Sequence, residues 1–141
     1  MGIADADTAE NESGSRNIVI APVLCAVPNR APGDPKLAGA GRLGIESNSL
    51  LHKIYGRSET DEQYFCNYEV NPGFEARMQA AGLRIVARGP AGEARAAEIP
   101  GNRFFLATLF QPQLSSQTDR PHPVLIAFIE AAGLWLDARR A

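Results

Sequence analysis

The sequence predicts an α/β or α+β fold, on three observations. Short β-branched or alternating runs are interleaved with segments whose apolar residues recur at helical spacing. The 141 residues suffice for one compact domain but not for two. Hydrophobic residues make up 45% of the chain and charged residues 21%, which is typical of globular proteins. We therefore predict an acidic flexible arm over residues 1–16 and a single domain over residues 17–141.

The first half of the chain predicts strands separated by a long loop. Residues 17–23 form a short β-branched run, and residues 42–46 are a second candidate strand. Three prolines and three glycines within residues 28–41 favour a loop. Residues 49–55 indicate a helical turn. Apolar and polar residues alternate over residues 63–70, as in a half-buried strand.

The second half predicts a helix, a hairpin, a buried strand and a last helix. Asn71 can cap a helix that begins at Pro72 and ends at Gly82. A four-residue turn over residues 89–92 predicts a β-hairpin. The continuously apolar run over residues 104–110 predicts a strand buried on both faces. A helical apolar stripe then follows: Leu125, Phe128, Ile129, Ala132 and Leu136.

Composition and charge exclude several classes of function. The net charge of −2 lacks the basic excess of a nucleic-acid-binding domain. No apolar run reaches the roughly 18 residues of a membrane-spanning helix, and the acidic N-terminus is unlike a secretory signal. Two cysteines do not make a disulfide framework, and the cysteines and histidines lack zinc-site spacing. We expect a soluble cytoplasmic protein with no metal, no cofactor, no nucleic-acid partner and no membrane.

Several motifs resemble, in order and spacing, the glutamine amidotransferase domain of CTP synthase. They are Arg42-Leu43-Gly44, Tyr68-Glu69-Val70-Asn71, Ala81-Gly82-Leu83, residues 104–113 and Arg120-Pro121-His122-Pro123. Three further stretches, residues 2–7, 61–66 and 109–116, resemble more closely the CTP synthase C-terminal region-related proteins, some of which are selenoproteins. The resemblance implies an α/β fold: an incomplete class I amidotransferase-like (flavodoxin-like) sheet, an added β-hairpin and a C-terminal helix. Only the C-terminal half of that domain is expected here.

The departures from the family pattern concern the catalytic residues. In class I amidotransferases a nucleophilic Cys is activated by a His in a Phe-His-Pro-Glu sequence, because a thiol at neutral pH needs a base. Gln111 stands where that His is expected and Gln113 where the Glu is expected. The family's nucleophile elbow would lie upstream of Met1. Asn67 replaces an Arg that helps to hold the glutamine carboxylate, and Cys66 replaces a His. We therefore expect no glutaminase activity.

Two hypotheses for function remain open. The first is a non-catalytic binding or assembly module, or part of a longer protein. The second is a small enzyme that uses Cys25 or Cys66 as a nucleophile or redox thiol. A pocket for a small molecule would then be lined by five residues: Asn67, Tyr68, Glu69, Gln111 and Gln113. The structural alternative for either cysteine is a small buried hydrophobic residue. His122 is expected to have a structural role at the start of the last helix.

The missing half of the sheet also predicts association. Without neighbours, the strand over residues 104–110 would expose an apolar edge, and such edges pair with other chains. We expect a homo-oligomer built around that strand and the last helix. The alternative is a partner that supplies the N-terminal half.

Overall fold

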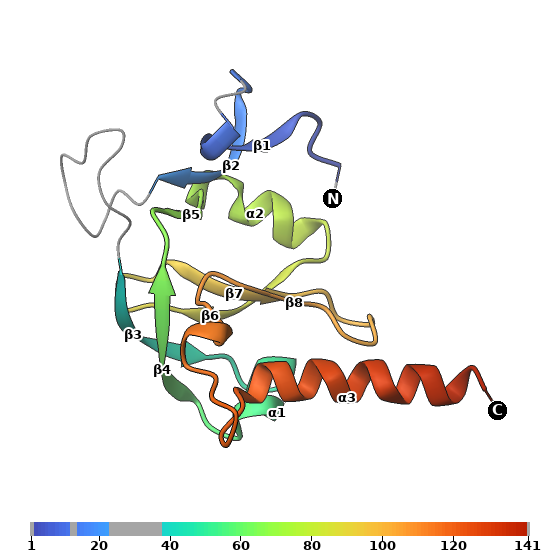
Figure 1. The fold of residues 1–141 in the computed structure, drawn as a ribbon. Coiled ribbons are helices and arrows are strands. Elements are labelled where there is room, and N and C mark those ends of the chain that lie inside the picture. The colour runs from blue at the N-terminus through green and yellow to red at the C-terminus, as the bar shows by residue number, and fades with distance from the viewer. Residues whose placement is uncertain (1, 12–13, 23–37, 141) are drawn as a thin grey trace.

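The computed structural model describes residues 2–11, 14–22 and 38–140. Two sheets make up the fold (Figure 1). A three-stranded sheet has the order β1-β2-β5, formed by Ala6–Thr8, Asn17–Pro22 and Tyr68–Val70. A five-stranded sheet has the order β4-β3-β6-β7-β8, formed by Glu59–Phe65, Ala38–Ile45, Arg84–Arg88, Ala94–Glu98 and Leu106–Thr108. Only β1 and β2 pair in parallel among these described strands.

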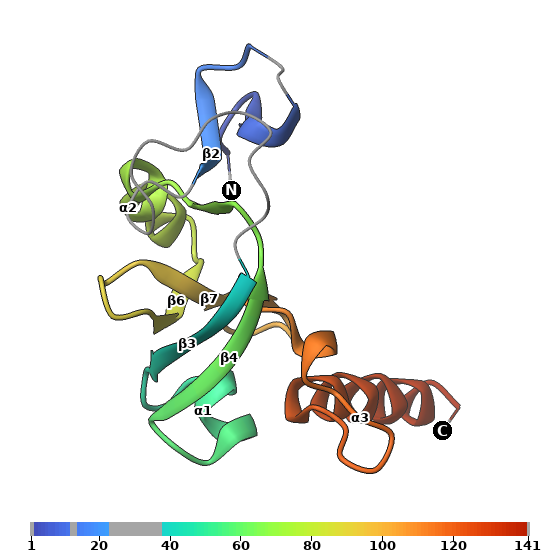
Figure 2. The same ribbon diagram turned by 60° about the vertical axis from the view of Figure 1, so that its left-hand side comes forward.

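Three α-helices and two short 3-10 helices complete the described fold. The α-helices are α1 (Leu50–Tyr55), α2 (Pro72–Ala80) and α3 (Pro123–Ala138), and the 3-10 turns are η1 (Ala9–Asn11) and η2 (Pro112–Leu114). Helix α2 lies beside the small sheet, whereas α1 and α3 lie at the opposite end of the molecule (Figures 1 and 2). Within the described residues, no helix is long and apolar enough to cross a membrane.

Local sequence signals explain where the helices begin. The Ser49 side chain accepts the N–H of His52 at 2.9 Å and caps α1. The Asn71 side chain caps α2 by accepting the N–H of Gly73 at 3.0 Å, as predicted. Its Nδ2 also donates to the carbonyl of Ile18 in β2 at 2.9 Å. The cap therefore also ties α2 to the small sheet.

The predicted hairpin is confirmed, and both of its strands are internal strands of the large sheet. Strands β6 and β7 pair antiparallel across the turn at residues 89–92. Gly92 has a positive φ of 82°, which the turn requires and which few other residues adopt. The principal core contains Val86 and Ala87 of β6 and Ala96 of β7, packed with Leu43 and Leu51.

The sheet curls so that its last strand comes close to its first. Beyond β8, the N–H of Gln111 donates to the carbonyl of Gln63 in β4 at 2.8 Å. The side-chain Nε2 of Gln111 donates to the carbonyl of Phe65 at 3.2 Å. This return of the chain covers part of the edge of β4, and it places the predicted site segment against β4.

The expectation of a central strand over residues 104–110 was wrong. Only residues 106–108 form a strand, β8, and it lies at the end of the strand order. The apolar side chains of the run have different partners. Phe110 is buried in the core, whereas Phe104 packs edge-to-face on Phe128 of α3 and Phe105 is 37% exposed. The run is apolar because its residues pack on different parts of the molecule, and not because they form one buried strand.

Other boundaries also differ from the expectations. Residues 38–41, expected in a loop, belong to β3, and the strand expected over residues 63–70 is divided into β4 and β5. Residues 6–11 take regular structure within the segment expected to be a flexible arm. The division of the chain at residue 16 stays a prediction, and residues 23–37 lie outside the described part.

The last helix forms as predicted, but its apolar stripe is not buried in the described chain. Phe128 is 56% exposed, Ile129 68% and Leu136 44%. Val124 in the first turn is buried, while the rest of the helix extends past the body of the molecule (Figure 1). The periodicity determined the helix, but it did not determine what packs on it.

Candidate functional site

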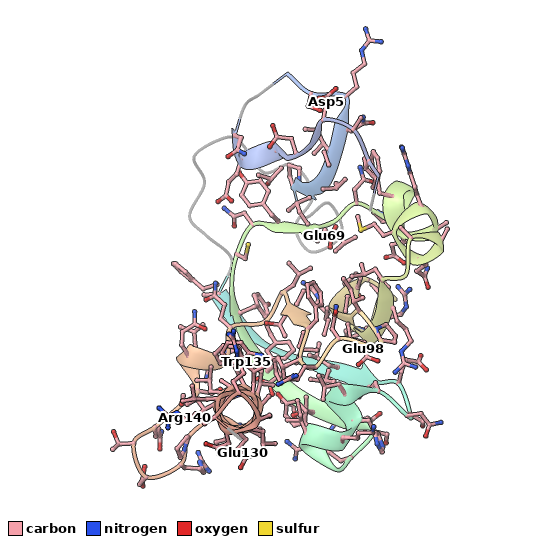
Figure 3. All side chains as sticks on the ribbon, turned by 90° about the vertical axis from the view of Figure 1, so that its right-hand side faces the viewer. Asp5, Glu69, Glu98, Glu130, Trp135 and Arg140 are labelled. Atoms are coloured by element: carbon pink, nitrogen blue, oxygen red, sulfur yellow. The ribbon has the colours of Figure 1, made fainter. Side chains whose placement is uncertain are left out.

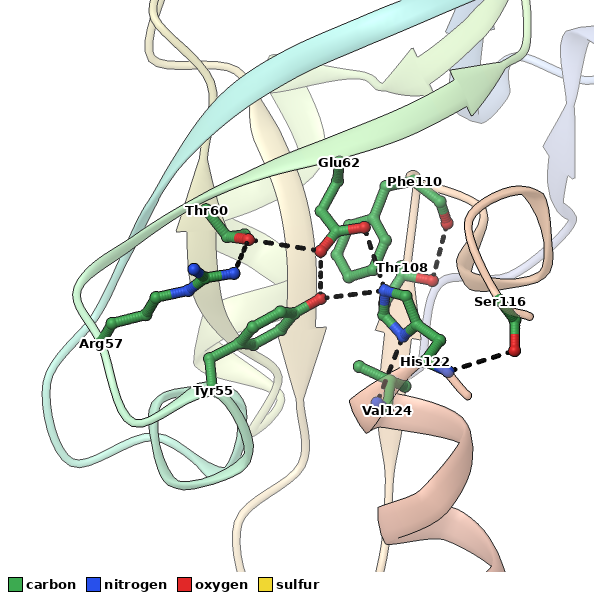
Figure 4. A network of polar contacts seen from close by, with 9 residues as sticks. All are labelled: Tyr55, Arg57, Thr60, Glu62, Thr108, Phe110, Ser116, His122 and Val124. Atoms are coloured by element: carbon green, nitrogen blue, oxygen red, sulfur yellow. Dashed lines mark hydrogen bonds and ion pairs between the residues drawn. The ribbon is translucent and has the colours of Figure 1, made fainter. Parts of the chain in front are cut away.

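A buried polar cluster of the large sheet is centred on the carboxylate of Glu62. Strand β4 turns Thr60, Glu62 and Tyr64 toward the same face, since alternate residues of a strand share a face. Glu62 and Thr60 are both buried. Figure 4 shows Tyr55 from α1 and His122 from the start of α3 converging on Glu62.

Three side chains donate to this carboxylate. The Tyr55 hydroxyl donates a short hydrogen bond to Oε1, and the hydroxyl of Thr60 donates to the same oxygen at 3.4 Å. His122 Nε2 lies 3.0 Å from Oε2. Arg57 in turn donates to the Thr60 hydroxyl at 2.8 Å. A buried carboxylate is costly unless its oxygens are satisfied, and here both of them are.

The hydrogen bonds of His122 assign its tautomer. Its Nδ1 accepts the backbone N–H of Val124 at 3.2 Å, so Nδ1 carries no proton. Nε2 therefore carries the proton, and this N–H donates a hydrogen bond to Glu62. The backbone N–H of His122 donates to the Ser116 hydroxyl at 3.1 Å. His122 thus caps α3 and fixes the helix to β4, which confirms the structural role expected for it.

The Tyr55 hydroxyl keeps its proton in this setting. Burial raises the pKa of Tyr55 well above its usual range, and the hydrogen bond to Glu62 and its charge raise it further. The ring lies 6.0 Å from the imidazole of His122, centroid to centroid, in an edge-on arrangement. The cluster joins α1, β4 and the start of α3 through one connected set of hydrogen bonds.

A cavity of about 230 Å³ opens on the same face of β4. It is bounded by β3, β4, the β6–β7 turn, β7 and the segment after β8. Its lining residues include Arg42, Glu62, Tyr64, Cys66, Glu93, Arg95 and Phe110. Glu93 and Arg95 form an ion pair at 2.8 Å across the wall. Although burial opposes it, the hydrogen bonds from Arg95 lower the pKa of Glu93.

Two glycines of β3 leave room for the Tyr64 ring in this wall. Gly39 is paired with Tyr64 across β3 and β4. A Cβ atom at Gly39 would lie 3.0 Å from the Tyr64 hydroxyl oxygen, and one at Gly41 would lie 3.6 Å from the ring. The ring can therefore lie flat over β3 beside the cavity.

Of the predicted site residues that the structure describes, Cys66 alone lines this cavity. Cys66 is half-buried, and its Sγ accepts the N–H of Tyr68 at 3.4 Å. Gln111 lies close to Cys66, because the Gln111 side-chain amide donates a hydrogen bond to the carbonyl of Phe65, the residue before Cys66. Gln113 is exposed on η2.

The other predicted site residues are placed elsewhere. Asn67 and Tyr68 are half-buried and Glu69 is buried, and β5 pairs Tyr68 and Glu69 with β2. None of the three lines the cavity beside Cys66. Cys25 falls outside the described residues.

The sequence interpretation missed the roles of Glu62 and Tyr55. The available signal was Glu62 itself, an acidic residue at an inward position of a strand with alternating burial. Acidic residues are rarely buried unless their charge is paired. Within the described part of the chain, no group of three or more His, Cys, Asp or Glu side chains could hold a metal ion.

Comparison with known proteins shows what this chain is similar to. No family model matches the chain. The CTP synthase of Methanoregula boonei is 35% identical over 135 residues, which is 92% of this chain and 24% of the relative. That of Rhodococcus opacus is 33% identical over 140 residues, which is 94% of this chain and again 24% of the relative.

A solved structure decides which part of these relatives is matched. The glutaminase domain of Trypanosoma brucei CTPS, with bound acivicin, superposes with a TM-score of 0.83 at 31% identity. The match covers 94% of this chain and 52% of that chain. This chain is related to the CTP synthase glutaminase domain.

The relationship confirms the expected family and its amidotransferase-like α/β fold. The chain spans about a quarter of the length of its curated CTP synthase relatives and about half of the solved glutaminase domain. The closer assignment to the selenoprotein-containing branch stays a prediction.

Proposed function

We propose that this chain is a non-catalytic, amidotransferase-like binding or assembly module related to the CTP synthase glutaminase domain. One observation carries the proposal: Gln111, which stands where the family resemblance implies the catalytic base, uses its amide to hold the segment after β8 against β4. An amide side chain takes up no proton at neutral pH, so it cannot activate a thiol.

The histidines offer no replacement base. His122 is 5% exposed, and both ring nitrogens are engaged, one by Glu62 and one by the cap of α3. His52 lies on α1, and it is not among the residues that line the cavity beside Cys66. The exposed Gln113 carries no carboxylate to orient a base. We place this module in the cytoplasm, consistent with two cysteines and no disulfide framework.

The test is ammonia release from glutamine by the purified chain. We expect a rate equal to that of a protein-free blank, because losing members of a nucleophile–base unit costs several orders of magnitude in rate. The matched controls are Cys66→Ser and Cys25→Ser. A rate clearly above the blank that either substitution abolishes would refute the proposal.

A second candidate function, a thiol-based enzyme, is favoured by the position of Cys66. Its half-buried side chain lines the cavity together with Glu62 and Tyr64. The discriminating experiment is alkylation with iodoacetamide near neutral pH, with the labelled cysteine identified by mass spectrometry. Fast labelling of Cys66 in the native state, removed by Cys66→Ser, supports the enzyme. Labelling of both cysteines only after denaturation excludes it.

A further inference from the structure

The outer turns of α3 carry the largest group of exposed apolar side chains in the described chain. Nine large hydrophobic residues of the described ranges are exposed, and six of them lie on this helix: Ile126, Phe128, Ile129, Leu134, Trp135 and Leu136. Soluble proteins seldom leave such a patch uncovered. A cover over these turns would remove most of the exposed apolar surface that the described chain presents.

Part of this surface already has partners within the chain. Phe128 packs edge-to-face on Phe104. The guanidinium carbon of Arg139 lies over the Trp135 ring, 4.7 Å from its centroid. Figure 3 looks along the helix and shows Trp135 and Glu130 on opposite sides of it. The surface that still needs a cover is therefore narrower than the six exposed residues suggest.

The remaining apolar surface lies on one side of the helix. At 100° per residue, Ile126, Ile129 and Leu136 fall within about 80° of one another, and we name these three the outer face of α3. The residues between Ile129 and Leu136 on this side, Ala132 and Gly133, are small. Nothing lies within 4 Å of the Cβ position of Gly133, so another element can approach the helix closely there.

The solved relative bears on what covers this face. Its match covers 94% of this chain, which leaves 6% of 141 residues, about eight, outside the match. Because α3 has 16 residues, at least about half of the helix belongs to the shared fold. The same match covers only 52% of the solved glutaminase domain. A domain packs its layers around one core, so the unmatched half of that domain packs against the half that this chain resembles.

The layers of the described fold indicate that α3 borders that second half. A helix of an α/β domain buries its apolar face on a sheet. Beyond its first turn, α3 extends past the strands of the large sheet (Figure 1). The sheet or helix layer that would cover the outer face is therefore not among the described elements.

The small sheet is incomplete in a similar way. Strand β1 stands at one end of its strand order and pairs in parallel with β2. Parallel strands usually belong to sheets that are covered on both faces. The apolar run of Ile18, Val19 and Ile20 in β2 is nevertheless only half-buried. A further half of comparable size would supply the layers that both ends of the described fold lack.

We propose that the outer face of α3 is the docking surface for a half-domain with the fold of the unmatched half of a CTP synthase-type glutaminase domain. This inference rests on the proposed function, because it names the partner of the assembly module. The half-domain is favoured over a second copy of this chain, because α3 belongs to the shared fold and the solved domain contains the additional half.

A chimera tests which face is covered. The unmatched half of the Trypanosoma brucei glutaminase domain is joined to the N-terminus of the full chain, in a Cys25→Ser, Cys66→Ser background. Ile129→Cys and Leu134→Cys are made separately, at side chains that are 68% and 71% exposed and about 140° apart around the helix. Alkylation by iodoacetamide is followed at each site by mass spectrometry. Relative to the chain without the added half, we expect labelling to slow about tenfold or more at Ile129→Cys and less than about threefold at Leu134→Cys.

Co-purification tests the same contact without a covalent link. The tagged chain is co-expressed with the unmatched half as a second polypeptide, and we expect a one-to-one complex. Ile129→Arg should weaken this complex about tenfold or more, and Leu134→Arg less than about threefold. Circular dichroism checks that both variants keep their helices.

Three outcomes overturn the docking surface. They are equal labelling of the two cysteine variants in the chimera, failure of the second polypeptide to co-purify, and a homodimer of the chain that Ile129→Arg dissociates. Ammonia release from glutamine is measured on the same complex. A complex that forms and releases ammonia refutes the proposed function but supports the docking surface, whereas a chain that neither binds the half-domain nor releases ammonia refutes the docking surface alone.

Discussion

The two ends of α3 differ in how the protein holds them. The first turn is fixed by polar contacts that are buried, with His122 bonded to Glu62 and to its own helix. The outer turns present Ile129 and Leu134, each about two-thirds exposed or more, and carry apolar surface without a described cover. The bond to β4 and the buried Val124 thus fix the first turn of the helix, whereas most of the apolar side chains of the outer turns are exposed. The comparison predicts that substitutions at the anchored end destabilise the fold, and that those at the outer end alter association.

The largest effect is expected from Glu62→Ala, which should lower the free energy of unfolding by about 3 kcal/mol. Tyr55, Thr60 and His122 would lose their shared acceptor in a buried place. Urea unfolding followed by circular dichroism measures the change.

The matched control on the same strand is Glu59→Ala, at an exposed residue whose carboxylate lies 3.6 Å from Arg42. It should change the free energy by less than about 0.5 kcal/mol. Equal losses of unfolding free energy in the two variants would show that the hydrogen bonds to Glu62 do not stabilise the fold.

A smaller effect, about 2 kcal/mol, is expected from His122→Ala. This substitution removes both the cap of α3 and the donor to Glu62. His122→Asn separates these two roles, because asparagine is a good helix cap but does not reproduce the imidazole donor. We expect it to recover about 1 kcal/mol in the same unfolding experiment. Full recovery would mean that the bond to Glu62 is dispensable.

The smallest effect is a change in how stability depends on pH at the anchored end. Tyrosine in an unfolded chain ionises near pH 10, whereas burial and Glu62 raise the pKa of Tyr55 in the folded protein. The folded state therefore binds the proton more tightly. The contribution of protonated Tyr55 to stability is complete below about pH 10 and is lost as the pH rises above that value.

Tyr55→Phe should flatten the loss of stability above pH 10 and leave the slope at neutral pH unchanged. Thermal unfolding across a pH series measures this. The control is Tyr64→Phe, since Tyr64 is outside the Glu62 network. If the stability of Tyr55→Phe falls above pH 10 as steeply as that of the wild type, Tyr55 is not the group responsible.

Local chemistry made several features predictable. Asn71 followed by proline indicated the start of α2, and the glycines around residues 89–92 indicated the hairpin. These signals work because a cap or a turn is decided by residues only a few positions apart. The family resemblance rested on short motifs in order, and the comparisons bear it out.

The candidate site was predictable only in part. Cys66 was expected near Gln111, and the two are brought together because the chain after β8 returns to β4. The cavity wall formed by Arg95 and Glu93 was not foreseen. It depends on the curl of the sheet, which brings the β6–β7 hairpin opposite β4.

The sequence by itself determined the helices, the hairpin and the family, because each follows from neighbouring residues or from ordered motifs. Tertiary structure alone decided that Glu62 meets His122, sixty positions away, and that residues 106–108 form an end strand rather than a central one. It also decided that the stripe of α3 faces outward. Periodicity states which residues share a face. Only long-range packing, with its balance of burial and chain entropy, selects what that face meets.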